Sequence, residues 1–405
     1  MKLKDSELSH HAANVIQNAG KIIEDFGARD PGSKGERDAT DYLQKEFEPL
    51  GDRTEIQKFP VVPKLFMGVG IYCMVCDLLA VLFFWIIPWL GFIFASLGLA
   101  IFLSISWFYV TIFDRFLARK ESQNLMCVKK PKGEIRRRIV IHGHVDASYE
   151  MRFQLISRKL YLALMVSAIL FVLVTFLLST LNLIFNTTWK NGYQSGWMVI
   201  GIILTMLSLI SIPIFFFYNY KIVSPGANDN LSGTLVPLEI AKICKEKNWE
   251  LENTEIIYLT TGSEEAGTRG AKHFAEENRE MFNSIETIFI SLDVLADPER
   301  ITALSSDHNG MVKMDVGIQD LLSRAAKKRD IKFRILPFPQ GAGSTDAARF
   351  QKAGFRAGSI LAVDHDLPTW YHTRLDTADV MDKECLAKVI DLMLATFEIY
   401  DKEGV

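Results

Sequence analysis

The chain has 405 residues, enough for one large domain or two of ordinary size. Its formal net charge is −3 and it contains no block of lysine and arginine, which argues against nucleic acid as a partner. Five scattered cysteines argue against a disulfide framework and favour a reducing compartment. The first stretch, "MKLKDSELSHHAANVIQ", is polar and lacks the apolar core of a signal peptide.

Two long apolar segments interrupt this sequence. Residues 65–113 contain a single charged side chain, Asp77. Because about 20 apolar residues cross a bilayer as a helix, this segment predicts two spans joined at "IIPWLG", and a second pair is expected at 160–185 and 197–220. Buried core helices are the alternative, but they seldom exceed about 14 uninterrupted apolar residues. Asp77 is expected either to have a function within the membrane or to make a hydrogen bond inside the bundle.

The rest of the chain predicts one discontinuous domain. We expect it to comprise residues 1–63, 114–159 and 221–405, with membrane hairpins at 64–113 and 160–220. Spacing of apolar residues predicts helices at 5–26, 36–49, 231–246, 268–280, 316–329, 344–352 and 383–401. Buried strands are predicted in "RRRIVIHGHVD", "TEIIYLTTGSEE", "ETIFISLDV" and "AGSILAVDHD". Strands that alternate with helices predict an α/β fold, with a mostly parallel mixed sheet covered by helices on both faces.

Acidic and histidine residues gather where these strands end, which is where α/β sheets bind ligands. They are His142, His144, Asp146, Glu264, Glu265 and Asp293, with Asp229 in "SPGANDNLSG" and His372 in "YHTRLDT". Taken singly, they have ordinary explanations such as helix caps, solvated acids or an ion pair between His372 and Asp376. A shared metal site explains them together, because imidazoles and carboxylates are ligands that suit Zn²⁺.

Six stretches of the sequence resemble those of a known family, in the family's order. They are "FGARDPGSKGERDATDYLQKEFEPLG", "IVIHGHVDAS", "SPGANDNLSGTLVPLEIAK", "TGSEEAGTRGAKHF", "SLDVLAD" and "YHTRLDTAD". The family is that of the co-catalytic di-zinc aminopeptidases, peptidase family twenty-eight, whose relatives include glutamate carboxypeptidase and glutaminyl cyclase. The resemblance covers nearly all of the sequence outside the apolar segments.

This resemblance implies two zinc ions per chain. By analogy with the family, His144 and Asp293 would bind one zinc, and Glu265 and His372 the other. Asp229 would bridge both ions, and the peptide bond after it is expected to be cis, as in relatives.

Two further residues gain catalytic roles from the same resemblance. Asp146 would hold His144 in the correct orientation without binding the metal itself. Glu264 would be the general base that takes a proton from a water held between the metals and hands it to the leaving amine. The adjacent Glu265 would bind a metal, so the two neighbouring glutamates would have different roles. Both side chains can point into one site from a turn, whereas neighbouring side chains of a regular strand point to opposite faces.

Other polar residues have less defined roles. Asp346 in "GSTDAARF" stands where the family has Ser-Asp-His, and it is expected either to contact substrate or to lie at a helix N-terminus. Tyr371 is a second candidate for substrate binding. We expect His142 to be structural, and His308 and His365 to be solvated or to support the site.

These features together predict a membrane-anchored di-zinc exopeptidase that removes N-terminal residues from peptides. Hydrolysis of another amide, as by a carboxypeptidase or on an N-acyl amino acid, is an alternative. Glutaminyl cyclase-like chemistry would need a single zinc, and a catalytically dead membrane scaffold would have lost ligands. The sequence specifies neither the side-chain preference nor the oligomeric state.

The distribution of charge around the apolar segments predicts their orientation. Flanks rich in lysine and arginine stay in the cytoplasm. Such residues flank the spans on the side of the catalytic domain, at Lys64, Arg115, Arg119, Lys120, Arg152, Arg158, Lys159 and Lys221, whereas the far loop has only Lys190. We therefore expect four spans, a cytoplasmic catalytic domain, and substrates that are short or membrane-associated, because the second hairpin begins soon after Asp146.

Overall fold

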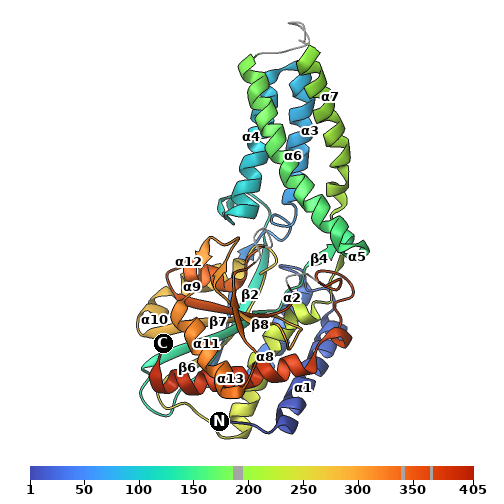
Figure 1. Cartoon of the computed structure of the whole chain (residues 1–405). Coiled ribbons are helices and arrows are strands. Elements are labelled where there is room, and N and C mark those ends of the chain that lie inside the picture. The colour runs from blue at the N-terminus through green and yellow to red at the C-terminus, as the bar shows by residue number, and fades with distance from the viewer. Residues whose placement is uncertain (186–194, 339–342, 365–367) are drawn as a thin grey trace. The chain divides into compact units, whose positions relative to one another are not determined.

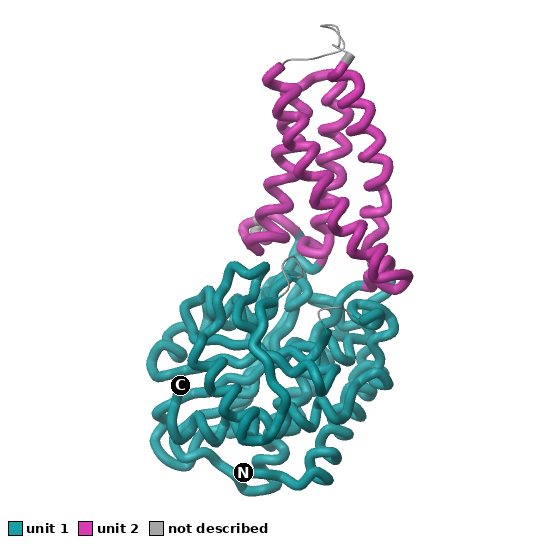
Figure 2. The backbone as a smooth tube through the Cα atoms, in the orientation of Figure 1, with its two compact units in different colours: residues 1–63, 118–149, 222–405 teal, residues 64–117, 150–221 magenta. Residues whose placement is uncertain are grey.

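The computed structural model describes residues 1–185, 195–338, 343–364 and 368–405, and it divides into two compact units (Figure 2). Unit 1 comprises residues 1–63, 118–149 and 222–405, and unit 2 comprises residues 64–117 and 150–221. Unit 2 contains both apolar segments. Each unit has its own hydrophobic core, and the two are described separately.

Unit 1 is built on a mixed eight-stranded sheet with the order β1-β2-β6-β3-β7-β12-β8-β11. The strands are β1 (Arg53–Val61), β2 (Lys120–Lys129), β3 (Arg137–His144), β6 (Thr254–Thr261), β7 (Glu286–Leu295), β8 (Ile301–Leu304), β11 (Arg334–Leu336) and β12 (Arg356–Ala362). The central strands β6, β3, β7 and β12 run parallel. Strands β1 and β2 pair antiparallel with their neighbours, while β8 is antiparallel to β12 and parallel to β11. The predicted α/β class with a mixed, helix-covered sheet is confirmed.

Helices cover both faces of this sheet (Figure 1). One face packs against α1 (Asp5–Phe26), α2 (Lys34–Phe47), α8 (Ser232–Glu246), α11 (Val316–Arg329) and α13 (Lys383–Glu403). The other face packs against α9 (Arg269–Glu277), α10 (Arg279–Asn283) and α12 (Asp346–Lys352). Successive residues of β3 point to opposite faces, so Ile139 and Ile141 join the first core and Val140 joins the second. All seven predicted helices are present, with ends shifted by a few residues.

Four strands of the sheet were not predicted, and their burial explains why. Strand β1 lies at the sheet edge, contains Pro60 and alternates between exposed and buried residues. Strand β2 begins with the polar run "KESQN", although most of it is buried. Strands β8 and β11 have only four and three residues. None of them has the continuous apolar run that identified the buried central strands.

Unit 2 is a bundle of long apolar helices. They are α3 (Val69–Ile86), α4 (Pro88–Ile101, continued as a π-helix over Phe102–Trp107), α6 (Arg158–Phe185) and α7 (Ser195–Ile210, followed by a 3-10 turn over Ile212–Phe216). Four helical segments are long and apolar enough to cross a membrane. The short elements α5 (Arg152–Ile156), β4 (Tyr149–Met151) and β5 (Tyr218–Val223) lie where the chain enters and leaves this unit. The proposed turn at 86–91 falls at Ile87, between α3 and α4.

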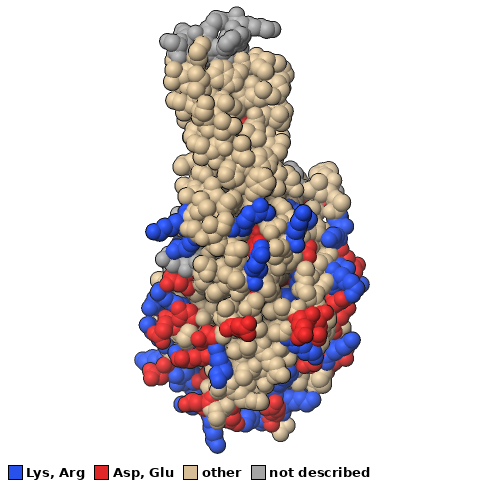
Figure 3. Space-filling view, turned by 90° about the vertical axis from the view of Figure 1, so that its right-hand side faces the viewer, with Lys and Arg blue, Asp and Glu red and all other residues tan. Residues whose placement is uncertain are grey.

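The bundle has an apolar outer surface, and polar side chains are buried within its apolar core. On α6, Val166, Leu170, Leu173 and Leu177 are about half exposed and share one face. The opposite face buries Thr175, Ser179 and Asn182, and the Asn182 side chain donates a 2.8 Å hydrogen bond to the carbonyl of Phe84. The surface along these helices is almost free of charged side chains (Figure 3). Such an arrangement is unfavourable in water and suits a hydrocarbon surrounding.

Asp77 on α3 is fully buried in this bundle, with one carboxylate oxygen beside Gly98 of α4. Among the described residues, neither of its carboxylate oxygens has a hydrogen-bond partner. The expected hydrogen bond inside the bundle is therefore not formed there.

Candidate metal centre

The carboxyl ends of three neighbouring parallel strands bring the candidate residues together. Strand β3 lies between β6 and β7 and is parallel to both. His144 is the last residue of β3, and Asp293 lies near the end of β7. Glu264 and Glu265 follow β6 in a turn. The residues chosen because ligand sites lie at the carboxyl ends of α/β strands thus do lie close together in the structure.

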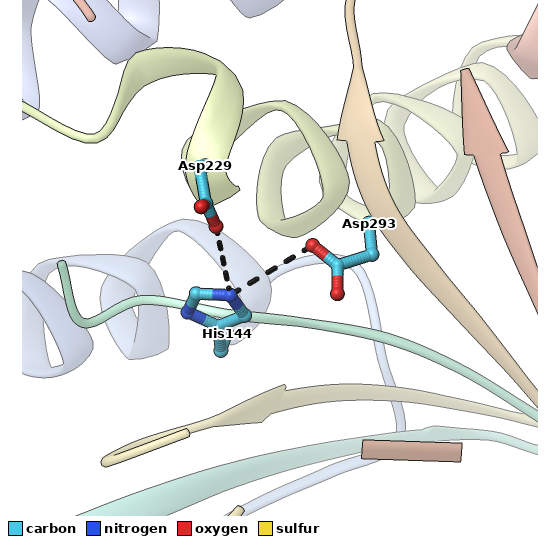
Figure 4. Close-up of side chains that lie close together, drawn as sticks. All are labelled: His144, Asp229 and Asp293. Atoms are coloured by element: carbon cyan, nitrogen blue, oxygen red, sulfur yellow. Dashed lines mark ion pairs between the residues drawn. The ribbon is translucent and has the colours of Figure 1, made fainter. Parts of the chain in front are cut away.

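The first group of potential ligands comprises His144, Asp229 and Asp293, all buried (Figure 4). His144 Nε2 lies 3.3 Å from Asp229 Oδ1 and 3.9 Å from Asp293 Oδ1. Asp229 belongs to the short helical turn Ala227–Leu231 that precedes α8. The peptide bond between Asp229 and Asn230 is cis, as expected.

The second group comprises Asp229, Glu265 and His372, which are also buried. His372 Nε2 lies 2.8 Å from Asp229 Oδ2 and 3.0 Å from Glu265 Oε1. Asp229 is therefore shared by both groups, and it presents a different carboxylate oxygen to each histidine. A bridging ligand between two metal ions requires this arrangement.

The donor atoms suit a divalent cation in both spacing and charge. Ligand atoms in each group lie within 4.8 Å of one another, and tetrahedral Zn²⁺ with bonds of about 2.0–2.2 Å separates its ligands by roughly 3.4 Å. The buried Oδ1 atom of Asp293 has no hydrogen-bond partner among the described residues. Burial alone would lower the pKa of His372, but the carboxylates of Glu265 and Asp229 raise it to about 10. The site thus carries excess negative charge that cations would balance.

Asp146 fixes the turn from which Glu264 and Glu265 both reach the same site. Its Oδ1 accepts a 3.0 Å hydrogen bond from the Glu264 amide, and its Oδ2 accepts one of 3.0 Å from the Glu265 amide. On the other side, Asp146 Oδ1 lies 3.4 Å from His144 Nδ1. The carbonyl oxygen of Asp146 is nearer still to His144 Nδ1, at 3.1 Å. Asp146 therefore orients this histidine through both its backbone and its carboxylate, and the carboxylate fixes the turn that carries Glu264 and Glu265.

Glu264 lies beside the first group of potential ligands. Its Oε2 lies 3.9 Å from His144 Nε2, and its side chain is 12% exposed. Burial raises its pKa well above the ordinary value; the His144 charge opposes this shift, and the carboxylate of Asp346 adds to it. Bound cations would lower this pKa, because nearby positive charge favours the ionised carboxylate.

Two buried residues that sequence reasoning did not assign hold the backbone around these ligands. Asp376 accepts hydrogen bonds from the amides of Asn228 and Asp229, at 2.9 and 3.0 Å, so it fixes the loop of the shared ligand. It was considered as an ion-pair partner of His372, but the described ion pairs of His372 are with Asp229 and Glu265.

Arg29 is the second such residue, and it is completely buried. Its guanidinium donates to the carbonyls of Val145, Pro225 and Gly226, at 2.9, 2.6 and 3.3 Å. It thereby ties the loop after β3 to the loop that leads to Asp229. The stretch "FGARDPGSKGE" was part of the family resemblance, and this was the available signal for Arg29.

The other expected residues lie close to the site or in the core. Asp346 is buried at the start of α12 and accepts a 2.6 Å hydrogen bond from Thr261, while its Oδ1 atom is unpaired among the described residues. Tyr371 stacks on the His372 ring with centroids 4.0 Å apart. His142 packs edge-on against Phe350, and burial followed by the His144 charge lowers its pKa to about 3. His142 is thus a neutral core residue.

Two further histidines complete the list. His308 is buried and its Nε2 lies 3.0 Å from the Lys352 ammonium nitrogen. His365 lies outside the described residues.

Comparison with known sequences agrees with this geometry. Residues 213–397 match the sequence model of Peptidase family M28, a range that includes Asp229, Glu264, Glu265, Asp293 and His372. The chain is also 30% identical over 190 residues to aminopeptidase YwaD of Bacillus subtilis (strain 168). That match spans 44% of this chain and 39% of the relative's length.

Solved structures share the fold across nearly the whole chain. The zinc aminopeptidase BSAP from Bacillus subtilis superimposes with a TM-score of 0.57 and 16% identity, covering 96% of this chain and 94% of its own. A glutaminyl cyclase from Bacteroides thetaiotaomicron, solved with N-acetylhistamine, gives 0.54 and 15%, covering 96% and 97%. The expected resemblance is therefore confirmed, in sequence to Peptidase family M28 over residues 213–397, and in fold to a zinc aminopeptidase and a glutaminyl cyclase.

Proposed function

We propose that this protein is a membrane-anchored di-zinc aminopeptidase. The observation that carries the proposal is the shared Asp229, with one carboxylate oxygen near His144 and the other near His372. His144 and Asp293 would complete one metal site, and Glu265 and His372 the other. Similarity to Peptidase family M28 and to aminopeptidase YwaD supports a metallopeptidase of this kind.

The residues of the site would divide the chemistry among them. Two bound zinc ions would lower the pKa of a water molecule between them and polarise the scissile carbonyl. Glu264 would accept a proton as the water oxygen bonds to the carbonyl carbon. The same carboxyl would return the proton to the amine nitrogen as the carbon–nitrogen bond breaks. Asp146 would keep His144 and the Glu264 turn aligned throughout.

Cleavage from a free amino end is part of the proposal. Glu264 and Asp293 are acids at the site that would attract an α-ammonium group, and Asp346 and Tyr371 are the adjacent candidates for substrate contact. A peptide and its N-acetylated form should therefore differ, with the free form cleaved faster. Faster cleavage of the blocked form would instead favour an N-acyl amino acid hydrolase.

The unit 2 helices would anchor the enzyme in a bilayer with its catalytic domain in the cytoplasm. Their apolar outer faces and buried polar faces support insertion, and the flanking lysines and arginines support the orientation. Unit 2 resumes at Glu150, four residues after Asp146 in the chain, which favours short or membrane-associated peptides as substrates.

Metal content and hydrolysis by the detergent-purified protein test the central claim. We expect two zinc ions per chain by elemental analysis, release of nitroaniline from aminoacyl-nitroanilides, and loss of that activity after chelation. One zinc with cyclisation of an N-terminal glutamine would favour the cyclase alternative, since the fold is shared by both enzyme types. A fully metal-loaded protein that hydrolyses none of these substrates would contradict the aminopeptidase assignment.

A further inference from the structure

The turn that carries Glu264 rests on a buried carboxylate outside the expected site. This residue is Glu36, in the first turn of α2, and it is fully buried. Its Oε1 accepts hydrogen bonds from the Ser263 amide at 2.7 Å, the Ser263 hydroxyl at 2.8 Å and the Ser122 hydroxyl at 3.0 Å. Its Oε2 accepts one from the Gly32 amide at 2.7 Å. Three of these four hydrogen bonds converge on the oxygen that faces Ser263.

Ser263 adopts a backbone conformation that needs such support. Its φ angle is +54°, in the left-handed region that residues with a side chain seldom occupy. The preceding Gly262 is packed so closely that an added Cβ would lie 2.7 Å from Ser122 Oγ and 3.1 Å from Glu36 Oε1. The backbone therefore turns at Gly262 and Ser263, where it packs against the Glu36 carboxylate, immediately before Glu264.

Two carboxylates divide the amides of this turn between them. The amides of Ser263, Glu264 and Glu265 are consecutive donors; the first binds Glu36 and the next two bind Asp146. Successive amides that donate in this way form a concave turn. Asp146 also faces His144, whereas the described side-chain hydrogen bonds of Glu36 are with Gly32, Ser122 and Ser263. The hydrogen bonds of Glu36 thus hold the backbone of the turn and do not involve the proposed metal ligands.

We propose that Glu36 is a positioning residue for the reaction, which directs the Glu264 carboxyl toward the metal centre by fixing Ser263. The proposal rests on the assignment of Glu264 as general base. Burial, followed by the Asp146 charge, raises the pKa of Glu36 to about 8, which agrees with the expectation below that a neutral amide can replace this side chain with little loss of kcat.

The test shortens the side chain without changing its charge. Glu36→Asp draws the carboxylate away from Ser263, and we expect kcat per zinc-loaded protein to fall about 10²-fold, the usual effect of misplacing a catalytic group by 1 Å. KM and zinc content should stay close to wild type. Glu36→Gln keeps an oxygen for Ser263 and should retain kcat within about tenfold of wild type. The matched control is Glu46→Asp, on the same helix and paired with Lys242, which should have no effect.

A second measurement does not depend on activity. Amide hydrogen exchange of the segment 262–268 should be faster in Glu36→Asp than in wild type or Glu46→Asp, without substrate present. If Glu36→Asp does not fold, Ser122→Ala removes one donor to the same oxygen and should lower kcat several-fold. Unchanged kcat in the folded, zinc-loaded variants would overturn the role of Glu36. An inactive wild-type protein would contradict the proposed function instead, while hydrogen exchange would still test the turn.

Discussion

Asp229 presents one oxygen to each of two histidines, and this single residue distinguishes a paired metal centre from two separate sites. The backbone amide of Asp229 donates a hydrogen bond to Asp376, and Arg29 binds the carbonyls of Pro225 and Gly226, which precede the turn of Asp229. A shared carboxylate must be held accurately because a shift toward one metal is a shift away from the other. The buried side chains around it hydrogen-bond mainly to backbone groups, which leaves the carboxylate oxygens of Asp229 and Asp293 for cations.

Replacement of Glu264 by glutamine separates catalysis from metal binding. Glutamine has the same shape but cannot accept the proton from water, so we expect turnover to fall about 10²–10⁴-fold. Zinc content should stay at two ions per chain, because the proposed ligands are untouched. The exposed Glu277→Gln on α9 is the control for loss of one negative charge. Full activity of Glu264→Gln would show that another group is the base.

Sequence reasoning found the candidate ligands because each one follows a strongly apolar strand or lies in a distinctive loop. His144, Glu265 and Asp293 could be located from the carboxyl ends of predicted strands alone. Arg29, Glu36 and Asp376 could not, because they bind backbone amides and carbonyls of loops distant in the sequence. Which backbone group meets which side chain depends on the assembled loops, and no residue spacing records it.

The segment from Arg29 to Glu36, which leads into the first turn of α2, contacts three separate loops of the site. Arg29 binds the loops after β3 and before Asp229, and Glu36 binds the turn after β6. The carbonyl of Arg29 also accepts a 3.0 Å hydrogen bond from the Ala147 amide. Because these loops adjoin or carry His144, Asp229 and Glu264, this segment joins two of the proposed metal ligands to the proposed general base.

Arg29→Lys should weaken metal binding although it keeps the positive charge. A lysine cannot make the divergent bonds of the guanidinium to Val145 and Pro225, so the two loops lose their common tie. We expect zinc affinity, measured by competition with a chelator, to fall about 10–100-fold, as is usual for residues that support metal ligands. Lys34→Met, a change at an exposed position nearby, is the control. Equal zinc affinity in both variants would contradict this role.

At the scale of the whole molecule, the two units differ in the side chains that they expose. Unit 1 buries apolar side chains on both faces of its sheet. Unit 2 exposes apolar residues such as Leu170 and Leu177 and buries Asn182. Composition predicted this contrast because apolar residues run all the way round the unit 2 helices. The unpaired state of Asp77 could not be predicted, since it depends on which side chains of α4 and α6 face it.

The orientation in the membrane can be tested with introduced cysteines. The natural cysteines of the chain are all buried, so they should contribute little background. A cysteine at Asn191, in the 186–194 segment outside the described residues, should react with an impermeant thiol reagent in intact cells. One at the exposed Lys327 of α11 should react only after permeabilisation. The reverse pattern would contradict a cytoplasmic catalytic domain.

The order of residues along the chain also bears on biosynthesis. A ribosome makes Arg29 and Glu36 first, yet their partners at Pro225 and Ser263 emerge only after both apolar hairpins have been synthesised. His372, without which the second ligand group is incomplete, comes later still. The nascent protein therefore cannot bring the two ligand groups together before the residues of all four apolar helices have been made, so any peptide cleavage at this site would be withheld until then.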